Sequence, residues 1–189
     1  NTAAEKTPPA TTPVWVAGFM SGTSLDAVDA AMILTDGDKV ADFGPAVERR
    51  YSAEERAVLQ AATEAARVWN WQGPVPEKPF KAALDVIRRT HAEAWHMLTG
   101  PARAPVPLLA GVHGQTLLHR RPAPGQKGAT LQLVDPYGLR AAFGVPMVCD
   151  FRTADVDAGG QGAPLAPAYH GALLDRLGTE PACVLNLGG

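Results

Sequence analysis

Apolar and polar positions alternate along this chain in the manner of an α/β protein. Apolar runs joined by short turns predict three consecutive strands at 14–20, 26–35 and 39–50. Apolar residues at helical spacing then predict two helices, one over 53–68 and a longer one over about 78–99, separated by a proline-containing loop. The pattern therefore favours an α/β fold.

Two residues refine these helices. Ser52 is a plausible N-cap for the first helix, because Glu54 and Glu55 follow in its first turn, where carboxylates suit the positive end of the helix dipole. His91 lies on the apolar stripe of the second helix, so we interpret it as a packing residue rather than a ligand.

Shorter elements are predicted in the second half of the chain. They comprise strands at 108–112, 130–134 and 145–149, a short helix at 136–143, a helix ending near 177, and a buried strand over about 182–187. Residues 1–13 are rich in Thr, Ala and Pro and are expected to form a disordered tail. Because the last predicted strand runs into a turn at Gly188 and Gly189, we expect the chain to be part of a longer protein that continues beyond Gly189.

Composition and charge limit the classes of function. With 189 residues, of which 46% are hydrophobic, the chain can form one core or one lobe of a larger enzyme. A net charge of -2 favours neither a nucleic-acid partner nor an anionic membrane. Cys149 and Cys183 lie in apolar runs and are predicted to be buried thiols rather than a disulfide or zinc site. No membrane span or signal peptide is recognisable, which indicates a cytoplasmic protein.

The first candidate site is the tight turn Ser21–Ser24 between two apolar runs. Small residues and hydroxyls at a hairpin tip let backbone N–H groups approach a phosphate, and Asp26 and Asp29 can hold a metal-bound water. The turn is therefore predicted to bind a nucleotide triphosphate. The alternative is an ordinary hairpin in which Gly and Ser only satisfy the turn geometry.

The second candidate site is Gly111–Thr116, which we place where the strand 108–112 ends. Ligand-binding residues of α/β folds gather just beyond the carboxyl ends of strands. His113, Gln115 and Thr116 offer donors and acceptors to a polyhydroxylated ligand. The alternative is a structural histidine in a turn.

The third candidate site follows the strand 145–149. Asp150, Arg152 and Asp155 form a charged cluster, and Gly159, Gly160 and Gly162 follow within the run GGQGAP before a helix begins. Glycines allow close ligand approach, and a helix start favours negative charge. The alternative is a structural ion pair between Asp150 and Arg152 that pins the loop.

Together the three motifs resemble one family closely. The segments GFMSGTSLDAVD, VHGQT and DFRTADVDAGGQGAPLAPAYH, followed by VLNLGG, look like the N-terminal half of anhydro-N-acetylmuramic acid kinase, over about residues 14–189. The resemblance implies the N-terminal lobe of an actin-like ATPase, a ribonuclease H-like fold with a mixed sheet and flanking helices, in a two-lobed sugar kinase. It implies an enzyme that opens the 1,6-anhydro bond of the cell-wall sugar with water and phosphorylates O6 from ATP, in peptidoglycan recycling.

The resemblance also assigns residues. The ATP-binding turn corresponds to Gly22, Thr23, Ser24, Leu25, Asp26, Ala27, Val28 and Asp29, with Mg²⁺ near Asp26 and Asp29. The sugar-binding positions correspond to His113, Gln115, Asp150, Arg152, Asp155 and Gln161. Ala27 replaces a glycine that is usual in the family, which is tolerable if its φ is negative.

The resemblance implies that the catalytic base lies elsewhere. The family carries its water-activating aspartate in a DTGPGN motif after the Asn-Leu-Gly-Gly strand, which here ends at Gly189. We therefore expect the general base beyond Gly189 and none within this chain, which alone should be inactive.

Two other classes of function stay open at this stage. One is a serine hydrolase using Ser21 or Ser24 with His113 and Asp150, although neither serine lies in a G-x-S-x-G elbow. The other is a non-catalytic sugar-binding domain that keeps the same fold. The expected partner is a small-molecule sugar, and a homodimer is compatible with the sequence.

Overall fold

A curved mixed sheet organises the chain, of which the computed structural model describes residues 12–102, 104–178 and 181–185. Strands β1 (Val14–Ser21), β2 (Ala27–Thr35) and β3 (Val40–Arg50) form an antiparallel meander. Strand β4 (Leu109–Arg120) runs parallel to β1, and β5 (Ala129–Leu133) pairs antiparallel with β4. The order within the described residues is β3-β2-β1-β4-β5, and the two-residue β6 (Met147–Val148) also pairs with β4, in parallel.

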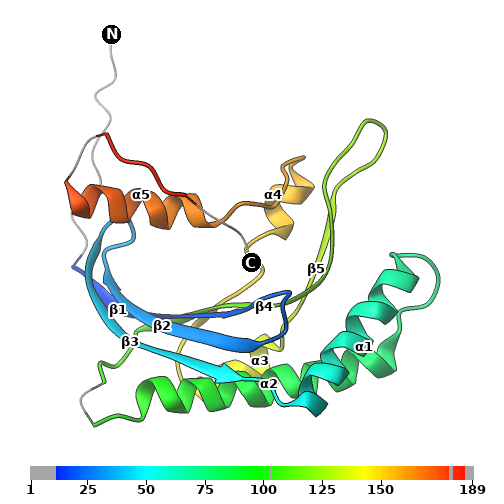
Figure 1. The fold of residues 1–189 in the computed structure, drawn as a ribbon, viewed down its shortest axis with the longest axis horizontal. Helices are drawn as coiled ribbons and strands as arrows, with labels where there is room; N and C mark the ends of the chain where they lie inside the picture. Colours follow the sequence, from blue (N-terminus) through cyan, green and yellow to red (C-terminus); the bar gives the residue numbers. More distant parts are fainter. Residues whose placement is uncertain (1–11, 103, 179–180, 186–189) are drawn as a thin grey trace.

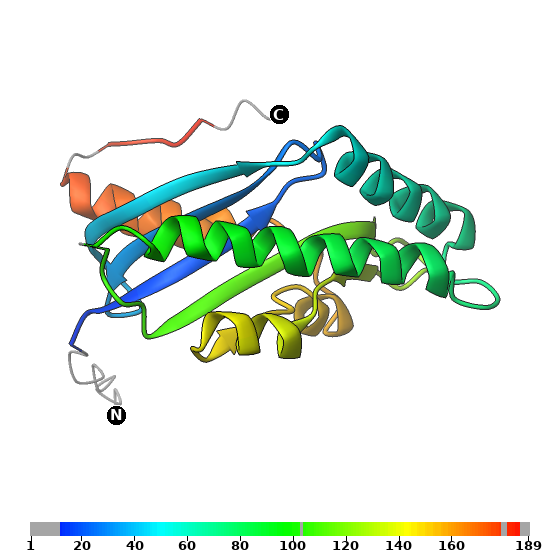
Figure 2. The same cartoon turned by 90° about the horizontal axis from the view of Figure 1, so that it is seen from below.

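Helices cover both faces of this sheet. Helices α1 (Ala53–Trp69), α2 (Glu77–Thr99) and α3 (Pro136–Phe143) lie on one side, and α4 (Thr153–Asp157) and α5 (Ala166–Leu177) lie on the other (Figure 1). Seen from below, α2 extends across the strands (Figure 2). The predicted mixed sheet with flanking helices is confirmed.

The core lies between the sheet and helices α1 to α3. An aromatic cluster forms its centre, where Phe143 stacks on Trp95 at 4.5 Å between ring centroids and Phe19 lies 5.0 Å from Phe143. His91 is fully buried beside Phe19, and its Nδ1 is 2.8 Å from the carbonyl oxygen of Ile87. The predicted packing role of His91 is confirmed.

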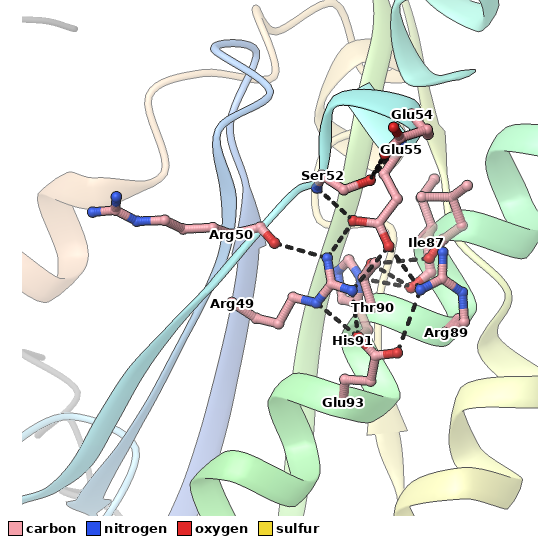
Figure 3. Close-up of polar contacts among 11 residues, drawn as sticks. Arg49, Arg50, Ser52, Glu54, Glu55, Ile87, Arg89, Thr90, His91 and Glu93 are labelled. Atoms are coloured by element: carbon pink, nitrogen blue, oxygen red, sulfur yellow. Dashed lines mark hydrogen bonds and ion pairs between the residues drawn. The ribbon is translucent and has the colours of Figure 1, made fainter. Parts of the chain in front are cut away.

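A network of ion pairs ties the end of β3 to both long helices (Figure 3). The buried carboxylate of Glu55 pairs with Arg49 from β3 and with Arg89 from α2, and Glu93 of α2 also accepts from Arg49. Glu55 additionally completes a capping box with Ser52, which confirms the predicted N-cap of α1. One carboxylate therefore fixes a strand, a helix start and a neighbouring helix together.

This network fixes the base of the hairpin turn as well. Directly after β3, the backbone N–H of Tyr51 donates to the carbonyl oxygen of Asp26 at 2.8 Å. The turn between β1 and β2 is thus attached at its base to the segment that the ion pairs hold.

Three sequence predictions differ from the structure. Strand β4 does not end at 112 but continues to Arg120, because its second half has β5 as a hydrogen-bonding partner. The strand predicted at 145–149 shrinks to β6. Residues 182–185 form no strand; they pair with none of the described strands, and Leu185 is 78% exposed. Cys183 is consequently exposed rather than buried, and Cys149 is half-buried.

Both ends of the chain carry predictions that the structure does not test. The predicted tail at 1–13 lies largely outside the described residues, and so does the turn predicted at Gly188 and Gly189. The expectation that the general base follows Gly189 therefore stays a prediction. Among the described helices, none combines the length and the apolar character that a membrane crossing requires.

Candidate active site

A pocket of about 600 Å³ at the end of β1 brings the three sequence motifs together. Gly22, Thr23, Ser24 and Asp26 line it from the hairpin turn, and His113 and Arg152 line it from the second and third motifs. Residues far apart in the chain therefore face one volume, and it joins residues that the sequence analysis assigned separately to a nucleotide and to a sugar.

The hairpin turn is held by short local contacts. The N–H of Leu25 donates to the carbonyl oxygen of Gly22 at 3.2 Å, and the Ser24 hydroxyl donates to Asp26 Oδ1 at 2.7 Å. That hydroxyl, together with backbone N–H groups, holds the pKa of Asp26 below its ordinary value, so the carboxylate is ionised at neutral pH. Leu25 has a φ of +55°, which is strained for a residue with a side chain.

The remaining residues of the predicted ATP-binding segment support the turn from below. Leu25, Ala27 and Val28 are buried, so they pack against the core rather than line the pocket. Ala27 lies in β2 and is not among the described residues with positive φ, so its methyl group is accommodated without backbone strain. The positive φ in this segment belongs to Leu25 instead, which sequence reasoning did not identify.

Asp29 lines a second pocket, which adjoins the first. It lies opposite Glu48 in the β2–β3 register, and both residues line a volume of about 1040 Å³ between the sheet and α5. Partial burial, and secondarily the charge of Glu48, raise the pKa of Asp29. The two pockets share Met20 and His113.

The two carboxylates predicted to hold a metal line adjoining pockets: Asp26 lines the pocket at the turn, and Asp29 lines the second one. Within the described residues, no group of three or more His, Cys, Asp and Glu side chains could hold an ion. Mg²⁺ in nucleotide sites is commonly held by one or two carboxylates together with phosphate oxygens and waters. Asp26, beside a turn of small residues, fits that donor set, and Asp29 could add a second carboxylate only from the adjoining pocket.

A bulge in β4 places the second motif. Phe19 pairs with Val112 but Ser21 pairs with Gln115, so β4 contains one residue more than β1 over this stretch. Gly114 makes the bulge possible: its φ is +71°, and a Cβ there would lie 2.3 Å from the carbonyl oxygen of Leu133. As a result His113 lines both pockets, whereas Gln115 is completely buried beneath the turn. The prediction that Gln115 contacts a sugar is not supported by this position.

The hydrogen bonds of His113 define its state. Its Nδ1 lies 2.8 Å from the carbonyl oxygen of Gly114, and its Nε2 accepts from Nε of Arg152 at 2.9 Å. Because a carbonyl oxygen can only accept and an arginine can only donate, the proton is on Nδ1 and the ring is neutral. Burial lowers the pKa of His113, and the charge of Arg152 lowers it further.

Arg152 lacks a carboxylate partner in the described part of the chain. Its Nη1 donates to the carbonyl oxygen of Gly162 at 2.5 Å, and its Nε bonds to His113. Asp150 instead accepts from the Thr153 hydroxyl at 2.5 Å, at the start of α4. The structural ion pair between Asp150 and Arg152 is therefore not formed. A guanidinium held only by neutral acceptors keeps its charge available for an anionic or polar ligand.

The glycine run of the third motif shapes the loop behind Arg152. Asp155 accepts from the N–H of Gly162 at 2.6 Å, and a Cβ at Gly160 would lie 2.3 Å from Asp155 Oδ2. Gly162 has a φ of +66°, and a Cβ there would lie 2.7 Å from the side chain of Val156. Asp155 thus closes the loop that supplies the Arg152 acceptor, and both Asp155 and Gln161 are exposed.

Several pocket residues were missed by the sequence reasoning. Ser21 and Thr116, which belong to the first and second candidate sites, also line the pocket, and so do Met20, His119 and Ala163, which the sequence analysis did not assign to a site. His119 follows His113 on the continuation of β4, so a longer predicted strand would have brought it into the second candidate site.

The geometry argues against a serine hydrolase. The Ser21 hydroxyl donates to the carbonyl oxygen of Gly114, Ser24 bonds to Asp26, and Asp150 bonds to Thr153. Both ring nitrogens of His113 are occupied by groups other than a serine or an aspartate. The Ser–His–Asp contacts that nucleophile activation requires are not formed among these residues.

Comparison with known proteins identifies relatives of this chain. The family model for anhydro-N-acetylmuramic acid kinase matches residues 14–189. Proteins named anhydro-N-acetylmuramic acid kinase from Phenylobacterium zucineum, Cereibacter sphaeroides and Rhizobium rhizogenes are 49%, 48% and 44% identical to it. The alignments cover 92%, 93% and 94% of this chain and 48%, 43% and 48% of the three relatives. The chain therefore spans about half the length of the curated relatives it matches.

Proposed function

The chain belongs to the anhydro-N-acetylmuramic acid kinase family, and we propose that it forms the ATP-binding and part of the sugar-binding side of such a kinase. The reaction we propose is ATP-dependent conversion of 1,6-anhydro-N-acetylmuramic acid to N-acetylmuramic acid 6-phosphate, in cytoplasmic peptidoglycan recycling. The observation that carries this proposal is the pocket in which the hairpin turn, His113 and Arg152 meet.

We propose further that the fold is the N-terminal lobe of an actin-like, ribonuclease H-like ATPase. An antiparallel β1–β2–β3 meander, followed by β4 and β6 running parallel to β1, supports this assignment. In such a two-lobed arrangement the nucleotide lies in the cleft, against the hairpin turn of this lobe.

On the nucleotide side, Gly22, Thr23 and Ser24 supply backbone N–H groups to the phosphates of ATP. Asp26 and Asp29 would hold Mg²⁺ or its waters, and an ion bound there would supply positive charge close to the phosphates. The ionised state of Asp26 at neutral pH supports this role.

On the sugar side, Arg152 and His113 contact the substrate, with Asp150, Asp155 and Gln161 shaping the neighbouring loops. Arg152 donates to an anionic or hydroxyl oxygen, since no carboxylate of the described residues neutralises it. Neutral His113 keeps Arg152 oriented through its Nε2.

The two parts of the reaction share one oxygen. Water attacks C1 of the sugar, the C1–O6 bond breaks, and O6 takes the γ-phosphoryl group while ADP leaves. The proton of the water passes to a carboxylate base, which we assign to the aspartate of the family's DTGPGN motif, beyond Gly189. Because O6 is released beside the γ-phosphate, ring opening and transfer can occur in one closed site.

The decisive assay follows phosphate transfer in the complete protein. Formation of N-acetylmuramic acid 6-phosphate and ADP from the anhydro sugar and ATP is the expected result. A sugar-dependent rise in melting temperature without turnover would indicate the non-catalytic sugar-binding alternative. The absence of both turnover and a nucleotide-dependent rise in melting temperature would refute the kinase assignment.

A further inference from the structure

Gln115 is buried directly beneath the hairpin turn, in a position where its amide can act on the turn but not on a ligand in the pocket. Its side chain is fully buried. Its Nε2 donates to the carbonyl oxygen of Gly22 at 3.2 Å and to that of Thr116 at 3.3 Å. Since both partners are acceptors, they fix which end of the amide faces the turn.

This contact determines the direction of a neighbouring N–H group. The carbonyl oxygen of Gly22 receives both Gln115 Nε2 and the N–H of Leu25, so the peptide plane between Gly22 and Thr23 is held in one orientation. In a trans peptide the N–H points opposite to the C=O. The N–H of Thr23 therefore points away from Gln115, and Thr23 lines the pocket.

The oxygen of the Gln115 amide lowers the stability of the fold. Gln115 Oε1 is buried and has no hydrogen-bond partner among the described residues. An unpaired buried acceptor destabilises a fold by about 1–3 kcal/mol. An apolar side chain of the same length would avoid this cost, so packing does not account for a glutamine here. The contact that requires an amide is the one to Gly22.

We propose that Gln115 is a positioning residue for the phosphoryl groups of the nucleotide: by holding the Gly22 carbonyl inward, it keeps the Thr23 N–H directed at the phosphates. This role rests on the proposed kinase function and assigns Gln115 to the nucleotide side of the site. It also links the nucleotide turn to β4, the strand that carries His113.

The test compares Gln115→Met with Gln132→Met in the complete protein. Methionine keeps the length of the side chain and removes the donor. Gln132 is a matched control, because it lies on the neighbouring strand β5 and its side-chain amide donates, within the described part of the chain, only to the hydroxyls of Thr130 and Thr116. Calorimetry measures binding of ATP, inorganic tripolyphosphate and adenosine to each variant.

We expect Gln115→Met to bind ATP and tripolyphosphate about tenfold to a hundredfold more weakly, as the loss of an oriented N–H donor to a charged group implies. Adenosine affinity should change less than about twofold, and Gln132→Met should resemble the wild type throughout. A merely structural role would weaken all three ligands together. Partial unfolding lowers the binding stoichiometry rather than the affinity of the folded molecules, so a less stable variant remains informative.

Two outcomes would overturn the proposal, and they are distinguishable from failure of the kinase assignment. One is an equal loss for adenosine and tripolyphosphate, and the other is unchanged affinity for all ligands, each in a background where the wild type turns over. If the wild type itself neither binds ATP nor phosphorylates the sugar, the proposed function fails and this inference fails with it.

Discussion

Replacing Arg152 by alanine tests whether the third motif serves the ligand or only the fold. The substitution removes the Nε donor to His113 and the Nη1 donor to Gly162. It also removes Nη2, for which the described residues supply no acceptor. If Nη2 binds the sugar, the loss of one charge-assisted hydrogen bond is worth about 1.5–3 kcal/mol. The KM for the sugar should then rise about tenfold to a hundredfold, while the KM for ATP stays close to the wild-type value.

The same change should also lower stability. Arg152 is half-buried, and two hydrogen bonds from its charged guanidinium, worth about 1.5–3 kcal/mol each, are lost. Steady-state kinetics with each substrate varied in turn, together with thermal melting, separates the two effects. Arg50→Ala is the control, since the Arg50 side chain is 84% exposed and, among the residues that the structure describes, bonds only to Glu48. A lowered melting temperature with both KM values unchanged would show that Arg152 is structural and refute its assignment to the ligand.

The other predictions concern the turn and the buried ionisable groups. Gly22→Val should weaken ATP binding at least tenfold, because a Cβ at this position would lie 3.1 Å from Ser24 Oγ and the two further methyl groups would displace the turn. Asp29→Asn should lower Mg²⁺-dependent turnover. Wild-type ATP affinity and turnover in both variants would contradict the phosphate and metal assignments. Glu55→Gln should lower the free energy of unfolding by about 2–3 kcal/mol at pH 7, because it leaves Arg49 without its main partner. Hydrogen bonds from Arg49 lower the pKa of Glu55 from 4.5 to about 2, so the stability it adds is complete above pH 4.5 and disappears as the pH falls to 2. Burial lowers the pKa of His91 from 6.5 to about 4, so the free energy of unfolding should fall by about 3 kcal/mol as the pH falls from 6.5 to 4. Denaturant titrations of His91→Leu over this pH range should lack that pH dependence.

Most of the element order could be predicted from local patterns. The start of α1 was predictable because Ser52 and Glu55 have the spacing of a capping box. The end of α3 was predictable because a glycine follows it, and Gly144 adopts the left-handed conformation that favours glycine after a helix. The packing of His91 followed from its place on an apolar stripe. These features depend on residues within a few positions of one another, so the sequence alone contains their cause.

The features that local patterns missed depend on distant partners. The second half of β4 is a strand because β5 pairs with it, and residues 182–185 are not a strand because no described strand does. Arg152 bonds to His113 rather than to Asp150, although Asp150 is two residues away, because the chain brings β4 alongside the loop before α4. The ion pair between Asp150 and Arg152, which their proximity in sequence suggested as the structural alternative, is therefore not formed.

Gly114 shows how one such feature shapes the whole site. In the sequence, this glycine suggests a turn at the end of a strand. In the structure, it allows one extra residue in β4 and a close approach to the carbonyl oxygen of Leu133. The bulge leaves His113 lining the pocket and Gln115 buried against the turn. A regular strand would leave residues 113 and 115 on the same face. The division of β4 between a residue in the pocket and a residue supporting the nucleotide turn therefore follows from a single glycine whose partner lies on another strand.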